Sequence, residues 1–387
     1  MAFVGMGGAV ATTAIAGIAR IRAGLSGLEG LPLADLDVPG LAPYGELAFG
    51  GWDLSGDDLL AAARGHAVLP REQLDAVADA LAGLVPWPAV GSTGFCRNID
   101  GANKREASGH REAVALIGDD LARFRESAGV DRVVVVNLAS TERTADPGHA
   151  AYGSIDAFER ALDANDAAIG PAMLYAYAAI ARGAGYANFT PSVAADVPAL
   201  VRLAERQRVP VAGKDGKTGQ TFMKTVLAPA LRARALHVDG WFSTNILGNR
   251  DGLALTDPDS LQSKLDTKGS VLDSILGYRV EDHLVDIRYY RPRGDDKEAW
   301  DNIDVAGFMG QRMQIKVNFL CKDSILAAPL AIEIARCLDL ARQRGEGGVQ
   351  AQLGAFFKAP MTPDGQAPEH AFPTQHQRLL DWLGRRG

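Results

Sequence analysis

The sequence predicts an α/β protein in which a doubly wound domain with a parallel sheet is followed by a part with a one-sided sheet. Three observations lead to this prediction. A strand, a glycine turn and a helix open the chain, a run of β-branched residues stands at 132–138, and strands with polar–apolar alternation follow residue 222. A uniformly apolar strand is typical of a parallel sheet covered on both faces, whereas alternation is typical of an antiparallel sheet with one exposed face.

Composition excludes several classes of protein. With 387 residues, 47% hydrophobic and 22% charged, the chain is long enough for two or three domains and is neither disordered nor fibrous. Lys and Arg number 40 against 47 Asp and Glu, and the net charge of −7 indicates no basic surface for nucleic acid. The three cysteines, Cys96, Cys321 and Cys337, lie far apart in the sequence, so we expect neither a disulfide framework nor a zinc site. We therefore expect a cytoplasmic location.

The N-terminal element could be mistaken for a membrane segment, because Met1–Ala19 carries no charged side chain. No basic region precedes this stretch, and four glycines and two threonines interrupt it, so we expect neither a signal peptide nor contact with a membrane. We predict instead a strand at Ala2–Val4, a glycine turn, and a helix over about Ala9–Arg20.

Strand, glycine turn and helix form the opening unit of a dinucleotide-binding fold. Gly5 and Gly7 fill the first two glycine positions, but Val10 stands where the third is usual, so a plain strand–helix turn is an equal alternative. An acidic residue should end the second strand and hold a ribose. Glu29 has the spacing but lies in an irregular insertion. Asp53 is the better candidate, with a helix N-cap as its alternative role.

The remaining elements alternate up to about residue 221. The strand at 132–138 ends near Thr141, at the edge where open α/β sheets bind ligands. Beyond residue 222 we expect an antiparallel sheet with one exposed face, a common platform for oligomers. The other expected elements are helices at 155–165, 171–182, 325–344 and near 376–383, and strands at 209–212, 238–246, 285–290 and 314–319.

The most informative polar stretch is GKDGKTGQT at 213–221, which follows a strand and opens a helix. Backbone N–H groups at a helix N-terminus, together with the hydroxyls of Thr218 and Thr221, suit a phosphate. The spacing of a Walker A loop is missing, and a capping turn is the alternative.

Three further stretches have ordinary alternatives. Asn245 begins a string rich in Asn, Asp and Gly that could be turn chemistry alone. Lys264 and Lys268 share a helix face, which is usually solvated. Asp323 stands where an apolar strand runs into an apolar helix, as a buried functional acid or as an N-cap.

Taken together, these stretches resemble the inositol-1-phosphate synthase (inositol-3-phosphate synthase) family. The resemblance runs through nearly the whole chain, in order. Its strings are FGGWDLS (Phe49–Ser55), VVNLASTER (Val135–Arg143), GKDGKTGQTFMK (Gly213–Lys224), STNILGNRDG (Ser243–Gly252), SKLDTK (Ser263–Lys268), RGDDK (Arg293–Lys297), KDSILAAP (Lys322–Pro329) and FFKAP (Phe356–Pro360).

The resemblance implies an isomerase that converts D-glucose 6-phosphate to 1D-myo-inositol 3-phosphate with NAD as a catalyst. C5 is oxidised by hydride transfer, C6 is deprotonated, the enolate closes on the C1 aldehyde, and the ketone is reduced again. Each step places negative charge on an oxygen or moves a proton, which lysines can serve. The alternatives are an NAD-dependent dehydrogenase, a cyclase for another sugar phosphate, and a non-catalytic nucleotide sensor.

The resemblance also assigns the site residues. The catalytic set is Lys264, Lys268, Lys297, Lys358 and Asp323. The cofactor set is Gly5, Gly7, Asp53, Thr141, Asp215 and Asn245. The substrate phosphate would be held by Thr218, Gly219, Gln220 and Thr221, with Lys268 and Lys297.

Some features depart from the family or stay open. Val10 in the glycine turn changes the expected pyrophosphate contacts, and Lys214 adds a cation to the loop that would hold the phosphate. A helper cation is used by some members, and the sequence leaves the metal open. By resemblance, residues 1–221 plus 323–387 form a Rossmann-like NAD-binding domain. Residues 222–322 form an inserted α+β catalytic domain through which subunits pair into a homotetramer.

Overall fold

The structure is a computed structural model that describes residues 1–96, 99–248, 271–363 and 366–385. Its larger sheet has seven parallel strands in the order β11-β6-β5-β4-β1-β2-β3. From β3 to β6 this is the order of a doubly wound dinucleotide-binding sheet, which reverses between β1 and β4. The strands are β1 (Ala2–Val4), β2 (Gly50–Asp53), β3 (Trp87–Pro88), β4 (Val134–Asn137), β5 (Gly185–Asn188), β6 (Pro210–Gly213) and β11 (Gly348–Val349).

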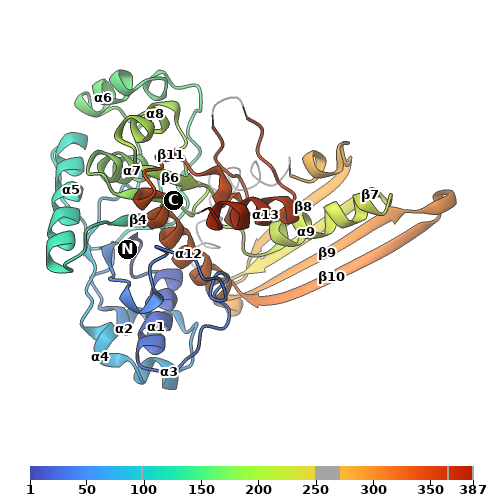
Figure 1. Cartoon of the computed structure of the whole chain (residues 1–387), viewed down its shortest axis with the longest axis horizontal. Coiled ribbons are helices and arrows are strands. Elements are labelled where there is room, and N and C mark those ends of the chain that lie inside the picture. Colours follow the sequence, from blue (N-terminus) through green and yellow to red (C-terminus); the bar gives the residue numbers. More distant parts are fainter. Residues whose placement is uncertain (97–98, 249–270, 364–365, 386–387) are drawn as a thin grey trace.

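Helices cover both faces of this sheet (Figure 1). Those expected from the sequence are confirmed as α1, α6, α7, α12 and α13, with ends displaced by a few residues. The helices are α1 (Ala9–Arg22), α2 (Leu59–His66), α3 (Arg71–Asp75), α4 (Ala78–Ala82), α5 (His110–Ser127), α6 (Ile155–Asp163), α7 (Pro171–Ala181), α8 (Pro198–Gln207), α12 (Asp323–Gln343) and α13 (Phe372–Leu383). The 3₁₀ helices are Tyr44–Glu46, Ala150–Tyr152, Arg291–Arg293, Phe308–Gly310 and Ala351–Phe356.

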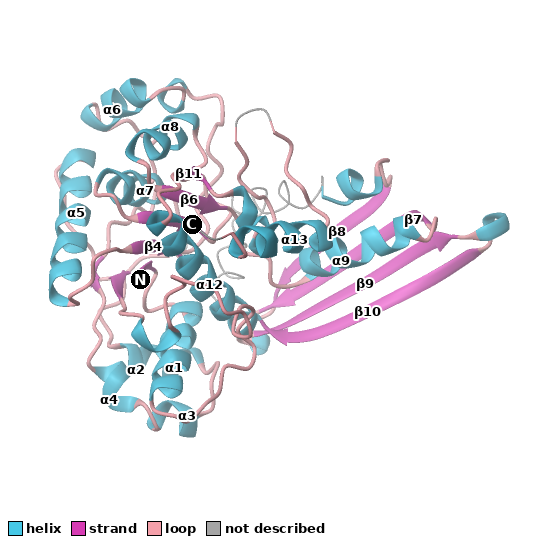
Figure 2. Cartoon of the chain, viewed as in Figure 1, coloured by secondary structure: helices cyan, strands magenta, loops and turns pink. Residues whose placement is uncertain are grey.

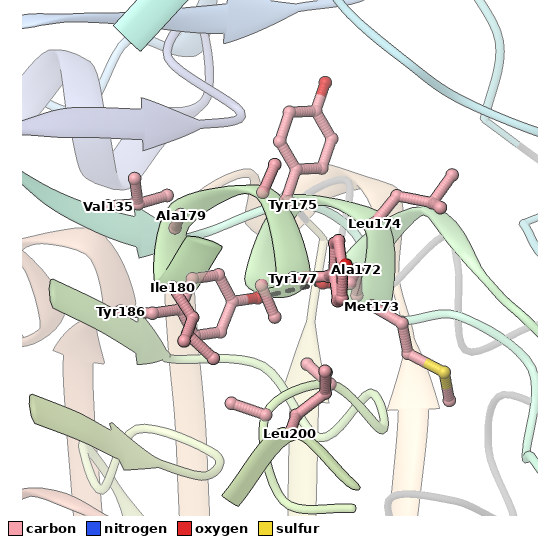
Figure 3. Close-up of a cluster of buried hydrophobic side chains, with 14 of the residues drawn as sticks. Val135, Ala172, Met173, Leu174, Tyr175, Tyr177, Ala179, Ile180, Tyr186 and Leu200 are labelled. Carbon is pink, nitrogen blue, oxygen red and sulfur yellow. Dashed lines mark hydrogen bonds between the residues drawn. The ribbon is translucent and has the colours of Figure 1, made fainter. Parts of the chain in front are cut away.

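Alternate residues of β4 enter two different hydrophobic cores. Val135 packs with α5, α7 and α8 on one face, whereas Val134 and Val136 pack with α1 and α12 on the other. Figure 3 shows the first core around α7, where the Tyr186 hydroxyl donates to the Ala172 carbonyl at 3.2 Å. Burial on both faces explains why the sequence of this strand is uniformly apolar.

The smaller sheet extends away from the larger one (Figures 1 and 2). Its strands, in the order β10-β9-β7-β8, are β7 (His237–Leu247), β8 (Asp282–Tyr289), β9 (Asp296–Ala306) and β10 (Arg312–Lys322). The expectation of an antiparallel sheet is wrong in one respect, because β8 runs parallel to β7. The chain between these two strands is long enough to return to the end where β7 began, as a parallel pair requires.

One face of the smaller sheet is covered and the other is exposed. Helix α9 (Gln220–Ala233) and a helical turn at 271–276 pack on the covered face around Trp241 and Ile303. The opposite face exposes Phe242, Leu284 and Leu320. In the part of the chain described, no helix is both long and apolar enough to span a membrane.

Candidate active site

The glycine turn after β1 lies at the point where the strand order of the larger sheet reverses. Gly5 has φ +87°, and its N–H donates to the Trp52 carbonyl at 2.8 Å. A Cβ atom at Gly5 would stand 3.2 Å from the backbone of Ala139, in the loop that follows β4. The turn therefore needs glycine both for its conformation and for its contact with that loop.

Gly7 and Asp53 form the second part of this turn. The Gly7 N–H donates to Asp53 Oδ2 at 2.8 Å, and a Cβ atom on Gly7 would stand 3.1 Å from Asp53 Cγ. The alternative role of Asp53 as a helix N-cap is wrong. The N-cap of α2 is Asp58, whose side chain accepts from the Ala61 N–H at 2.8 Å.

The N-terminus of α1 suits an anionic group. Gly8 is its N-cap, no side chain of the described residues caps it, and its first turn has no acidic residue. The partial positive charge of the helix end is thus not neutralised by a neighbouring carboxylate in that turn. These features fit the pyrophosphate of a dinucleotide. Val10 is the second residue of α1 and packs at the edge of the core.

Thr141 and Glu142 follow β4 at the same edge of the sheet. Thr141 is buried, and it lies two residues after the backbone that Gly5 contacts. Glu142 Oε1 accepts from the Ala172 N–H at 2.9 Å and so caps α7. Burial raises the pKa of Glu142 to about 7. The Glu142 N–H donates to Ser192 Oγ at 3.0 Å, a partner beyond β5 that the sequence did not indicate.

The polar loop at 213–221 follows β6 and is held by the C-terminal part of the chain. Lys358 Nζ donates to Asp215 Oδ1 at 2.6 Å, and the Lys358 N–H donates to the Asp215 carbonyl at 2.7 Å. Both side chains are buried. Two predicted site residues 143 positions apart are therefore in direct contact. Lys214 Nζ lies 2.7 Å from Asp196 Oδ2, so this additional cation is neutralised within the loop region.

A second lysine–carboxylate pair lies where the two sheets meet. Lys297, on β9, places Nζ 3.2 Å from Asp323 Oδ1, and Thr218 Oγ1 donates to the same oxygen at 2.9 Å. A Cβ atom at Gly219 would stand 3.3 Å from Lys297 Nζ. The alternative role of Asp323 as an N-cap is wrong, because Lys322 is the N-cap of α12 and Asp323 is its first residue.

Gln220 and Asn245 link α9 to the smaller sheet. Gln220 Nε2 donates to the carbonyls of Thr244 at 3.0 Å and Trp300 at 3.1 Å, which fixes the orientation of the amide. Its Oε1 atom therefore accepts from Asn245 Nδ2. Asn245 Oδ1 is buried and has no hydrogen-bond partner in the described part of the chain. A donor from a bound ligand would satisfy this oxygen.

Gly219 is the N-cap of α9, and Gln220 and Thr221 are its first two residues. The Gln220 side chain bonds to the strands, so the contribution of this residue to an anion site is its backbone N–H. Thr221 is buried in the same turn. Lys264 and Lys268 lie outside the described residues.

Two further buried lysines in this region were not predicted. Burial lowers the pKa of Lys217 from 10.5 to about 7, and its Nζ donates to Gln375 Oε1 on α13. Burial lowers the pKa of Lys224 to about 8, against the opposing effect of Asp301. Among the residues described, no group of three or more His, Cys, Asp and Glu side chains could hold a metal ion.

The fold and the site define an α/β dinucleotide-binding protein. Next to the edge of the larger sheet that carries the glycine turn, it has a polar site in which lysines pair with carboxylates. The sequence model of the myo-inositol-1-phosphate synthase family matches residues 32–384. The chain belongs to this family, whose model describes an NAD-binding domain.

Individual relatives agree with this assignment. Inositol-3-phosphate synthase 1 of Bacteroides thetaiotaomicron is 42% identical, over 98% of this chain and 93% of that protein. The crystal structure of inositol-3-phosphate synthase from Caenorhabditis elegans matches 99% of this chain and 84% of its own, with a TM-score of 0.91 and 26% identity. A myo-inositol-1-phosphate synthase-related protein from Thermotoga maritima matches 99% of this chain and 97% of its own, with a TM-score of 0.84 and 26% identity.

Proposed function

We propose that this chain converts D-glucose 6-phosphate to 1D-myo-inositol 3-phosphate, with NAD recycled within each turnover. One observation carries the proposal: a buried lysine–carboxylate pair, Lys358–Asp215, and a partly buried pair, Lys297–Asp323, meet the loop that opens α9. The lysines can stabilise oxyanions, and the lysines and carboxylates can transfer protons. A member of this family with a dinucleotide-binding sheet needs both kinds of group at its active site.

The dinucleotide would be held at the edge of the larger sheet. Gly5, Gly7 and the N-terminus of α1 would take the pyrophosphate, and Asp53 the ribose. We assign Thr141, Asp215 and Asn245 to the nicotinamide end. NAD, when bound, supplies the acceptor for the C5 hydride and returns that hydride after ring closure, so the net reaction is an isomerisation.

The phosphate of the substrate would be held at the start of α9. The N–H groups of Gly219, Gln220 and Thr221 would donate to it, and the Thr221 hydroxyl would add a donor. The Thr218 hydroxyl donates to Asp323 Oδ1, so Thr218 would join the phosphate site only by turning its single O–H away from that carboxylate. Lys297 lies beside this turn, since its ammonium is 3.3 Å from the position of a Cβ atom on Gly219. We assign Lys297 and Lys268 to the phosphate charge.

Lys358 and Lys264 are assigned to the reacting oxygens and to proton transfer. The Lys358 ammonium is held by Asp215, so a carboxylate fixes its position before any substrate arrives. An oxygen that gains negative charge would accept a hydrogen bond from this ammonium. Asp323 would orient Lys297 in the same way, and it also accepts the O–H of Thr218.

The division of the chain and its assembly complete the proposal. Residues 1–221 plus 323–387 would bind NAD, and residues 222–322 would form the catalytic and oligomerisation domain. The exposed face of the smaller sheet carries Phe242, Leu284 and Leu320, and we assign it to pairing within a homotetramer. The small number of cysteines, three in 387 residues, accords with a cytoplasmic location.

The decisive experiment is a turnover assay on the purified chain with NAD⁺ and glucose 6-phosphate. Phosphorus NMR should show an inositol phosphate replacing the substrate, while absorbance at the NADH wavelength stays flat. Steady growth of that absorbance without inositol phosphate would overturn the proposal in favour of a dehydrogenase.

A further inference from the structure

Lys224 lies on α9 one helical turn beyond Gln220, on the side that faces the smaller sheet. Its side chain is 3% exposed, and its Nζ atom lies 2.6 Å from Nε2 of His283 on β8. An ammonium has no lone pair, so Nζ donates and the imidazole nitrogen accepts. This bond joins two residues 59 positions apart.

A buried carboxylate lies beside this pair, in a layer formed by Lys224, Trp241, Ser243, His283 and Asp301. Asp301, on β9, accepts from Trp241 Nε1 at 2.8 Å and from Ser243 Oγ at 2.6 Å, both on β7. Lys224 Nζ also lies 5.8 Å from the centre of the Trp241 ring. Asp301 is 1% exposed and is the charge that favours the ammonium form of Lys224. The layer therefore joins α9 to the three strands β7, β8 and β9.

The strand register places this layer on the site-bearing face of the sheet. Trp241 is opposite His283, and Ser243 is opposite Asp301. Asn245 follows two residues along β7 on the same face, because side chains of a strand alternate between faces. The layer therefore lies on the same face of the sheet as Asn245 on β7 and Lys297 at the start of β9.

We propose that Lys224, through His283, is a positioning residue that sets the direction of α9 and so aims its first turn at the substrate phosphate. The proposal rests on the phosphate site described above. Gln220 fixes the first residue of α9 through its bonds to the Thr244 and Trp300 carbonyls. Further along α9, Ala228 and Leu231 pack in the apolar core. The Lys224–His283 bond adds a directed contact one turn after Gln220, next to the residues that would face the phosphate.

The geometry explains why the effect should reach phosphate binding. The N–H groups of residues 219–221 and the Thr221 hydroxyl act on an anion only when they converge on one position, and a small rotation of α9 moves them together. Lys224 does not need to touch the substrate for this effect. Its loss should therefore weaken binding of the phosphate more than it slows the chemistry.

The test compares Lys224→Met, His283→Leu and His283→Gln. Gln can offer an acceptor to Lys224 near the position of Nε2, whereas Leu cannot. For Lys224→Met and His283→Leu, KM for glucose 6-phosphate should rise about ten-fold, while kcat changes by less than about three-fold. Weaker competitive inhibition by inorganic phosphate, by the same factor, should accompany the change. His283→Gln should stay within about two-fold of wild type.

Each alternative result has a defined meaning. Equal loss of kcat and NAD affinity in both disrupting variants would indicate a general structural role and overturn the proposal, as would an unchanged KM. If Lys224→Met does not fold, the His283 pair alone decides, because His283 is partly exposed. Titration of inorganic phosphate by calorimetry gives the same comparison without turnover. A wild-type chain that binds phosphate but makes no inositol phosphate would overturn only the proposed reaction.

Discussion

Replacing Lys217 with Met should stabilise the protein near neutral pH and lose this advantage as the pH rises. The Lys217 ammonium is buried, and its partner Gln375 is neutral. Burial lowers its pKa from 10.5 to about 7. Met has a similar length and no charge, so the variant removes the cost of desolvating the ammonium.

The sign and size follow from proton linkage. Below pH 7 the folded and unfolded chains both bind the proton, so the penalty is constant and at its largest. Between pH 7 and 10.5 the unfolded chain keeps the proton that the folded chain has lost, so wild-type stability rises with pH. Each pKa unit is worth about 1.4 kcal/mol, so the advantage of Lys217→Met should shrink by about 3 kcal/mol between pH 7 and pH 9.5.

The assay is urea unfolding of wild type and Lys217→Met at both pH values and one protein concentration. The variant also leaves Gln375 Oε1 without its donor, which costs about 1–3 kcal/mol at either pH. The difference in free energy of unfolding between variant and wild type is therefore less informative at one pH than its change with pH. Lys104→Met is the control, because Lys104 lies outside the smaller sheet and pairs with the half-exposed carboxylate of Asp100, so this change removes no buried ammonium. A Lys217→Met gap that stays constant with pH would refute the reasoning.

Four other outcomes follow from the site and the sheets. Lys358→Met should lower kcat about 100-fold or more while NAD affinity, measured by calorimetry, stays within about two-fold. Lys297→Met should raise KM for glucose 6-phosphate about ten-fold, and inhibition by inorganic phosphate should weaken in parallel. Gly5→Ala should weaken NAD binding about ten-fold or more, because its Cβ meets the Ala139 backbone at 3.2 Å and φ is +87°. Leu320→Glu should dissociate the proposed tetramer, as light scattering of the eluted protein would show.

Much of the fold could be predicted because hydrophobic periodicity records which faces are covered. The uniform strand at 132–138 and the alternating strand at 314–319 have these patterns because β4 contacts two cores and β10 contacts one. Strand β9 was not predicted. Its sequence is rich in charge, yet Lys297 and Asp301 are buried on the inner face, where partners from other elements stabilise them. The parallel pairing of β8 was also not predictable, because alternation indicates an exposed face and not a strand direction.

The candidate site could be predicted only as separate stretches. The glycine turn, the loop at 213–221 and Asp323 each stand at an element end, which is visible in the sequence. The contact of Lys358 with Asp215 joins residues 143 positions apart, and no local pattern records it. Lys224 and His283 were missed for the same reason. His283 is an isolated histidine until the register of β7 and β8 places it beside α9.

The partners of the buried lysines separate two kinds of function. Lys297 and Lys358 each contact a carboxylate, whereas Lys217 contacts an amide and Lys224 an imidazole. A carboxylate partner favours the ammonium form, and a lysine kept charged can stabilise an oxyanion or a phosphate. A neutral partner gives no such direct support. Burial lowers the pKa of Lys217 and of Lys224, and at Lys224 the nearby Asp301 opposes this shift without cancelling it. We therefore assign the chemistry to the two carboxylate-paired lysines among those described, and the holding of α9 and α13 to the other two.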